Sequence, residues 1–177
     1  LSTGDWVAFA VKTDGSVYGW GNSECGKLGP QFPEGIYQSP QLIQGLRDVT
    51  AINTSYSGRV ARDKTGSVYY WGSGGGDRPG REKICAVGGV MPDGKTFNRY
   101  QTTSFEKQTI ANVAEVFIQN VNAFALTTDG EVYGWGDGGA GLLANATGTD
   151  IYGNLQGLRV VTPSKIPGLP PVRQLGF

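Results

Sequence analysis

Short apolar segments alternate with glycine-rich turns along most of the chain. Residues 7–11 read VAFAV and are followed by Thr13-Asp14-Gly15. Residues 17–20 then read VYGW, and Gly21 ends the apolar run. Val, Phe, Tyr and Trp favour strands, and an Asp-Gly pair tolerates the positive φ angles of a tight hairpin turn. This pattern predicts a β-hairpin, with one strand on each side of the Asp-Gly pair.

The hairpin pattern occurs three times. Residues 8–21 read AFAVKTDGSVYGWG and residues 123–136 read AFALTTDGEVYGWG, with eleven of fourteen positions identical. Residues 59–72, RVARDKTGSVYYWG, form a more divergent middle copy. Three tryptophans and three turn glycines mark the copies: Trp20, Trp71 and Trp135, and Gly15, Gly66 and Gly130. We expect these six residues to have structural roles, with the tryptophans packed between neighbouring repeats.

A second repeated block follows the hairpin. Residues 39–46, SPQLIQGL, match residues 162–169, TPSKIPGL, and each block is followed by a predicted strand, at 49–52 and at 172–175. The corresponding strand of the middle copy is predicted at 113–117. Each unit therefore holds about four strands, too few to cover both faces of its own sheet. Stacked units solve this problem, and the sequence predicts an all-β fold of the β-propeller type.

The repeated motifs resemble those of the regulator of chromosome condensation family. The resemblance is carried by ALTTDGEVYGWG at 125–136, by GNSECGKLG at 21–29 and by the proline-led blocks. It implies about three four-stranded propeller blades, as a partial ring or as a ring completed by other copies or by further sequence. We expect a single domain over 1–177, with repeats at about 1–46, 47–110 (including an insertion at 73–100) and 111–169, and the start of a fourth at 170–177.

The composition disfavours several classes of protein and of functional site. The chain has 29 glycines in 177 residues, only 17% charged residues, and equal numbers of basic and acidic residues, 15 of each. A helical bundle and a nucleic-acid-binding protein are therefore disfavoured. There is no histidine, which removes the commonest general base and the commonest zinc ligand. We expect no enzyme activity and no cofactor, and the absence of a long apolar run argues against membrane insertion.

The resemblance implies a protein-binding face built from the loops between strands. We therefore expect a non-enzymatic protein–protein interaction module, a propeller scaffold that presents loops to a protein partner. One alternative is a structural or self-assembling subunit, such as an adhesin or a filament, that forms homo-oligomers through open blade edges. Another is a regulator resembling guanine nucleotide exchange factors, acting on a small GTPase.

Aromatic and basic residues outside the repeated strands are the candidate partner contacts, because loops on a rigid scaffold often carry recognition. They are Trp6, Phe32, Tyr37, Tyr56, Arg78, Arg81, Tyr100 and Tyr152. Cys25 and Cys85 both follow a Trp-Gly strand end in consecutive repeats, so they could meet in a disulfide. Such a disulfide would favour a secreted or cell-surface location, while two free thiols are the alternative.

Overall fold

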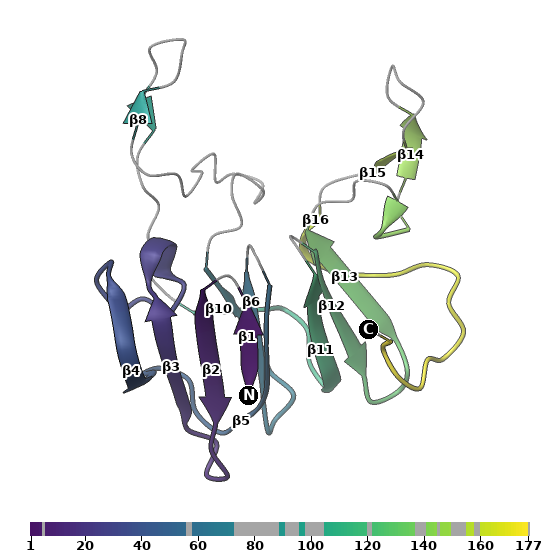
Figure 1. Cartoon of the computed structure of the whole chain (residues 1–177). Helices are drawn as coiled ribbons and strands as arrows, with labels where there is room; N and C mark the ends of the chain where they lie inside the picture. Colours follow the sequence, from purple (N-terminus) through teal and green to yellow (C-terminus); the bar gives the residue numbers. More distant parts are fainter. Residues whose placement is uncertain are drawn as a thin grey trace.

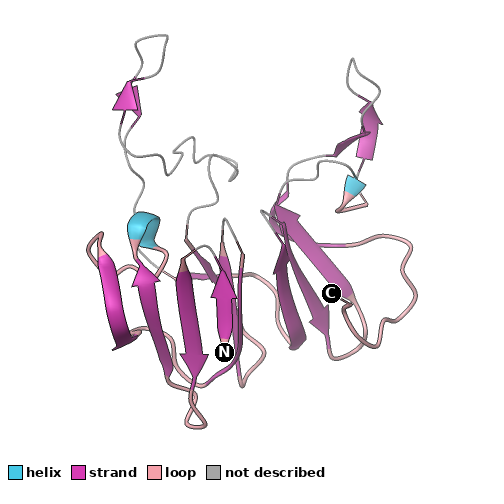
Figure 2. Ribbon diagram, in the orientation of Figure 1, coloured by secondary structure: helices cyan, strands magenta, loops and turns pink. Residues whose placement is uncertain are grey.

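The computed structural model describes residues 1–4, 6–55, 58–72, 89–90, 96–97, 105–119, 122–136, 141–144, 146–149, 155–157 and 160–176. Three four-stranded antiparallel sheets stand side by side (Figure 1). Strands and turns account for nearly all of the described structure, with the short helix η1 (Glu24–Gly26) after the third strand (Figure 2). The predicted all-β class, with three four-stranded units, is confirmed.

The first sheet shows how the alternating sequence builds each unit. Its strands are β1 (Ser2–Gly4), β2 (Val7–Val11), β3 (Val17–Asn22) and β4 (Ile36–Leu42), paired in chain order. Val7 and Phe9 are buried, whereas Ala8 and Ala10, which alternate with them along the strand, are only half-buried. This period of two is the side-chain period of a strand, and it points one face of the sheet toward the second sheet.

The other two sheets repeat this arrangement. The second contains β5 (Val49–Thr54), β6 (Arg59–Asp63), β7 (Val68–Trp71) and β10 (Glu106–Lys107). The third contains β11 (Val113–Gln119), β12 (Asn122–Thr127), β13 (Val132–Gly136) and β16 (Val160–Lys165). Two short hairpins are separate from them: β8 (Gly89–Val90) with β9 (Thr96–Phe97), and β14 (Ala146–Thr149) with β15 (Leu155–Gly157).

Two hydrophobic cores fill the spaces between successive sheets. Between the first and second sheets, Trp71 is 1% exposed and meets the ring of Phe9 edge-on at a centroid distance of 5.7 Å. Its indole Nε1–H donates to the carbonyl oxygen of Lys27 over 3.2 Å. Between the second and third sheets, Trp135 is 3% exposed and packs with Tyr70 and Val116, among others. One sheet alone cannot bury the apolar side chains on both of its faces, and packing against the neighbouring sheet buries them.

A backbone contact at the hairpin turns joins each sheet to the segment that follows it. The carbonyl oxygens of the three turn glycines accept hydrogen bonds from the backbone N–H of the first residue of the strand predicted to begin the next repeat. The pairs are Gly15 with Val49 (3.0 Å), Gly66 with Val113 (3.3 Å) and Gly130 with Val172 (2.9 Å). The turn is therefore also a docking point for the next repeat.

The strand predicted at 172–175 does not form, and that prediction is wrong. The segment starts at the expected place, since Val172 N–H reaches Gly130, and Leu175 N–H donates to Glu115 Oε2 over 3.1 Å. No strand in the described part of the chain pairs with it, so it has no ladder of hydrogen bonds. Its entry also differs: Asp48 and Asn112 precede β5 and β11 with φ of 54° and 56°, whereas proline, here Pro171, is held near −65°.

Candidate protein-binding surface

Trp6 is the most exposed aromatic side chain of the described structure, at 83%. It occupies the turn between β1 and β2, at the end of the first sheet where β3 leads into η1 (Figure 1). An indole exposed to this extent does not contribute to the core. Large aromatic side chains on rigid backbone are typical anchors of protein interfaces.

The backbone beneath Trp6 is held in an uncommon conformation. Its φ is 64°, in the left-handed region that bulky residues rarely adopt. The Trp6 carbonyl oxygen accepts the backbone N–H of Asn22 over 2.9 Å. Gly21 permits this approach, because a Cβ at that position would lie 2.2 Å from the same oxygen. Residues of β3 therefore hold the turn that carries the indole in one backbone conformation.

The loop after β3 is also internally fixed. Ser23 is fully buried, and its hydroxyl donates to the carbonyl oxygens of Pro33 (2.6 Å) and Gly35 (3.0 Å). The side-chain oxygen of Asn22 accepts the N–H of Glu24 over 2.8 Å. These bonds close residues 23–35 onto the end of the first sheet, beside the turn of Trp6. The two elements together form one well-defined surface at this end.

Phe32 does not belong to that surface, which corrects the sequence interpretation. Its side chain is only 7% exposed and packs into the core between the first and second sheets. It meets the ring of Tyr37 edge-on, at a centroid distance of 5.1 Å. Tyr37 is half-buried and its hydroxyl donates to the Pro33 carbonyl oxygen over 3.2 Å. An aromatic residue in a loop can thus be a buried support of that loop, a distinction that residue type alone does not make.

The remaining candidates cannot be placed. Five predicted contacts lie outside the described residues: Tyr56, Arg78, Arg81, Tyr100 and Tyr152. Cys85 lies outside them too, so the disulfide with Cys25, a residue of η1, stays a prediction. The sequence singles out Trp6 by its position outside the repeated strands, but it does not indicate that Asn22 and Gly21 fix the backbone of Trp6. Gly21, directly after the repeated Trp20, is the sequence signal for this close approach, although it also matches the end of a strand.

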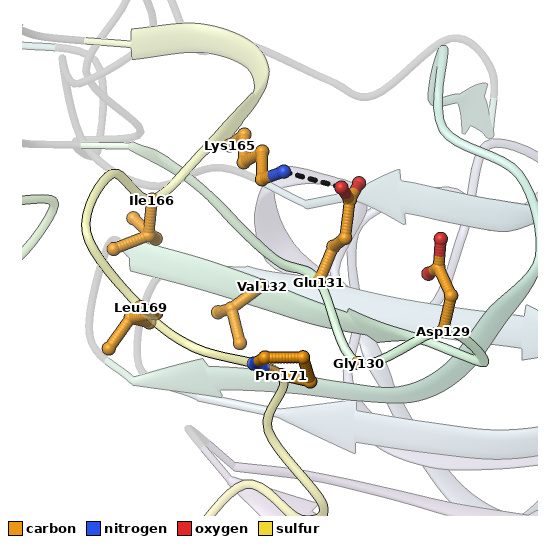
Figure 3. Close-up of a pocket in the computed structure, with 8 residues that line it drawn as sticks. All are labelled: Asp129, Gly130, Glu131, Val132, Lys165, Ile166, Leu169 and Pro171. Atoms are coloured by element: carbon orange, nitrogen blue, oxygen red, sulfur yellow. Dashed lines mark hydrogen bonds and ion pairs between the residues drawn. The ribbon is translucent and has the colours of Figure 1, made fainter.

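A small pocket with a volume of about 170 Å³ lies beside the hairpin turn of the third sheet, at the opposite end of the sheets from Trp6 (Figure 3). Lys165 forms an ion pair with Glu131 at its edge, and Tyr133 donates a hydrogen bond to the same carboxylate over 3.0 Å. The hydrogen bond from Lys165, followed by that from Tyr133, lowers the pKa of Glu131. A carboxylate stabilised in its charged form is a poor proton donor near neutral pH.

The second acidic group of the pocket is engaged in its own turn. Asp129 accepts a hydrogen bond from the Thr127 hydroxyl, which lowers the pKa of Asp129. The rest of the lining is apolar or glycine, including Ile166, Leu169 and Pro171 (Figure 3). Its acidic groups support the fold of the hairpin and of the chain beside it. We therefore regard the Trp6 end, and not this pocket, as the candidate functional site.

Two further searches apply to the described part of the chain. No group of three His, Cys, Asp or Glu side chains is placed there to hold a metal ion. No helix found there has the length and apolar character of a membrane span.

Comparison with known proteins identifies similar sequences and folds. Residues 1–27 match the model of the regulator of chromosome condensation (RCC1) repeat. The E3 ubiquitin-protein ligase HERC2 of Mus musculus is 30% identical over 171 residues, which cover 94% of this chain and 3% of HERC2. This chain therefore spans a small fraction of that relative.

Solved structures share the fold at lower identity. Human WBSCR16 has a TM-score of 0.63 at 22% identity, over 93% of this chain and 38% of that protein. Prp20p of Saccharomyces cerevisiae has a TM-score of 0.61 at 19% identity, over 97% of this chain and 39% of that protein. The Prp20p structure was described together with its binding to Gsp1p and histones. These likenesses establish the propeller type of the fold.

Proposed function

This chain belongs to the regulator of chromosome condensation (RCC1) repeat family, and we propose that it is a non-enzymatic protein-binding segment of a β-propeller. Its binding surface is the end of the sheets that carries Trp6 and the loop at 23–35. The partner is a protein that covers the exposed indole.

The observation that supports this function is the combination of exposure and rigidity at Trp6. The side chain is 83% exposed, while its backbone is fixed by the Asn22 hydrogen bond and by the close approach of Gly21. A partner that buries this indole removes a large apolar surface from water. It does so without first having to order the turn, which lowers the entropic cost of binding.

Binding to two kinds of protein tests the proposal: Gsp1p and histones, which are named together with the Prp20p structure. We expect the chain to bind at least one of them in a biolayer interferometry assay. Trp6→Ala should weaken that binding by tenfold or more, since truncated interface tryptophans typically cost about 2 kcal/mol or more. Circular dichroism of the variant should be unchanged, because the side chain is outside the core.

Leu169→Ala is the matched control for this experiment. Leu169 is also an exposed apolar side chain, at 49%, but it lies beside the hairpin turn at the opposite end of the third sheet. Its truncation should leave partner binding unchanged. Equal binding by Trp6→Ala and the unmodified chain, or no binding to either protein, would contradict the proposed function.

Nucleotide exchange on a small GTPase is a narrower form of the same function, which the resemblance to the regulator of chromosome condensation family raises. In that case the chain should accelerate release of a fluorescent GDP analogue from a small GTPase. Binding without acceleration would support an interaction module and exclude exchange activity on that GTPase.

A further inference from the structure

The loop at 23–35 is in contact with the second sheet as well as with the first. Its residues 31 and 33–35 are exposed and belong to the proposed binding surface. Leu28, in the middle of the loop, is instead 0% exposed and is part of the core between the first and second sheets. The exposed part of the loop therefore follows directly, along the chain, on a part that the second repeat covers.

One hydrogen bond from the second sheet reaches the backbone of this loop. The indole Nε1–H of Trp71, on β7, donates to the carbonyl oxygen of Lys27 over 3.2 Å. Trp71 is itself 1% exposed, and its ring meets that of Phe9 edge-on at a centroid distance of 5.7 Å. Because a close-packed core holds the donor in place, the bond fixes the position of residue 27.

Phe105 contacts the loop two residues further along. It directly precedes β10, so it belongs to the second repeat, and its ring meets Trp71 edge-on at a centroid distance of 5.1 Å. A Cβ added to Gly29 would lie 2.9 Å from the Phe105 ring, so the loop backbone passes directly against that ring. The second repeat thus contacts the middle of the loop through two aromatic side chains.

We propose that Trp71 and Phe105 are positioning residues of the binding surface, which two repeats therefore build together. They hold residues 27–29 and so keep residues 31–35 in the conformation that a partner meets. The inference rests on the function proposed above, because it concerns the same surface. A loop that is ordered before binding costs less to order in the complex, so the affinity depends on a buried tryptophan that the partner does not touch.

The third sheet provides a matched control for Trp71. Trp135 has the same repeat position and is 3% exposed, but its indole Nε1–H is buried with no hydrogen-bond partner in the described part of the chain. Replacing either tryptophan by phenylalanine keeps an aromatic ring and removes the same volume from a core. Only Trp71→Phe also removes a hydrogen bond to the loop. The difference between the two variants therefore isolates that bond.

Hydrogen exchange measures the positioning role directly. The backbone N–H groups of Gly26, Gly29 and Phe32 donate to carbonyl oxygens within the loop, over 3.0, 3.0 and 3.3 Å. In Trp71→Phe these three amides should exchange at least about tenfold faster than in Trp135→Phe, because the loop opens locally. The amides of β2 should exchange alike in the two variants. A role in core stability alone would instead accelerate exchange in the strands and in the loop together.

Partner binding supplies the functional readout. The probes are Gsp1p and histones, the proteins of the binding assay described above. Trp71→Phe should weaken binding by about tenfold and Trp135→Phe by less than about twofold, because only the first variant must order the loop on binding. Circular dichroism verifies that both variants are folded. If Trp71→Phe fails to fold, Phe105→Ala takes its place, since the Phe105 side chain is only partly buried.

The positioning role and the proposed function fail in different ways. Loop exchange that is the same in Trp71→Phe and Trp135→Phe would overturn the positioning role. A loop that exchanges faster while partner binding is unchanged would also overturn it, and would leave the function of Trp6 intact. If the unmodified chain binds neither protein, the proposed function is contradicted, and the exchange rates still decide whether the second repeat fixes the loop.

Discussion

At the residue scale, the hairpin glycines meet two separate demands. Gly15, Gly66 and Gly130 have φ of 79°, 77° and 88°, which the turn requires. A Cβ added to any of these glycines would also come into close contact with an atom of the next repeat. At Gly66 the nearest atom is Val113 N, at 2.8 Å. A side chain at Gly66 would therefore strain the turn and also push the next strand away from its docking point.

Three substitutions separate these two demands. Gly35 has open space around it and no positive φ, so Gly35→Ala should leave the free energy of unfolding nearly unchanged. Gly168 has a φ of 75° and open space, so Gly168→Ala should cost about 1 kcal/mol through backbone strain alone. Gly66→Ala should cost about 3 kcal/mol or more, because strain and overlap add. Urea denaturation measures all three, and equal losses for Gly168→Ala and Gly66→Ala would contradict the docking role of the turn.

At the scale of the element, a pair of facing positions on the second and third strands of each sheet has room for one large side chain. Phe9 is paired with Gly19 and Phe124 with Gly134, whereas the middle sheet pairs Val60 with Tyr70. A Cβ on Gly19 would lie 2.9 Å from the Phe9 ring. The large side chain can therefore come from either strand, but not from both, which explains why the middle copy reads YYW where the others read YGW.

A double-mutant cycle tests this exchange. Val60→Phe alone should destabilise by about 1–3 kcal/mol, because the added ring meets Tyr70. Tyr70→Gly alone should destabilise by about 3–5 kcal/mol, because it leaves a cavity. The double variant recreates the Phe-Gly pair of the other sheets, and it should be more stable than the sum of the single losses predicts by at least about 1 kcal/mol. Purely additive losses would show that the two positions do not share one space.

At the scale of the whole molecule, cohesion comes from the two junctions between sheets. Each sheet contributes one face to the junction before it and the other to the junction after it. Trp71 joins the first junction through Phe9, Phe105 and the Lys27 carbonyl, while Trp20 has no sheet against it in the described structure. The same repeat residue therefore differs in energetic weight according to its sheet.

The unequal contributions of Trp71 and Trp20 to the free energy of unfolding can be measured. Trp71→Ala should lower the free energy of unfolding by about 3–5 kcal/mol, as expected for a fully buried aromatic side chain. Trp20→Ala should lower it by less than about 2 kcal/mol, because its side chain is only half-covered. Urea denaturation of the unmodified chain and of both variants measures the two losses. Equal losses would mean that Trp20 is covered in the isolated chain.

The sequence predicts the fold in more detail than it predicts the candidate site. The repeated hairpins, their turn glycines and the four-stranded units follow from local patterns, because the period of two and the Asp-Gly turn are encoded in adjacent residues. The exposed position of Trp6 was only suggested by its place outside the repeat. Its fixed backbone depends on Asn22 and Gly21, which the antiparallel pairing of β2 with β3 brings to it.

The repeat, the all-β class and the strands within each unit follow from the order of residues alone, because these features depend on residues that are neighbours along the chain. Which aromatic residues face water depends instead on the packing of one sheet against another. Phe32 is buried because another sheet packs over its loop, and Trp20 is half-exposed although its sequence context nearly equals that of Trp135. The tertiary structure also left 172–175 without strand pairing. Burial and strand pairing depend on what lies beside a segment in space, and identical local sequences can have different neighbours.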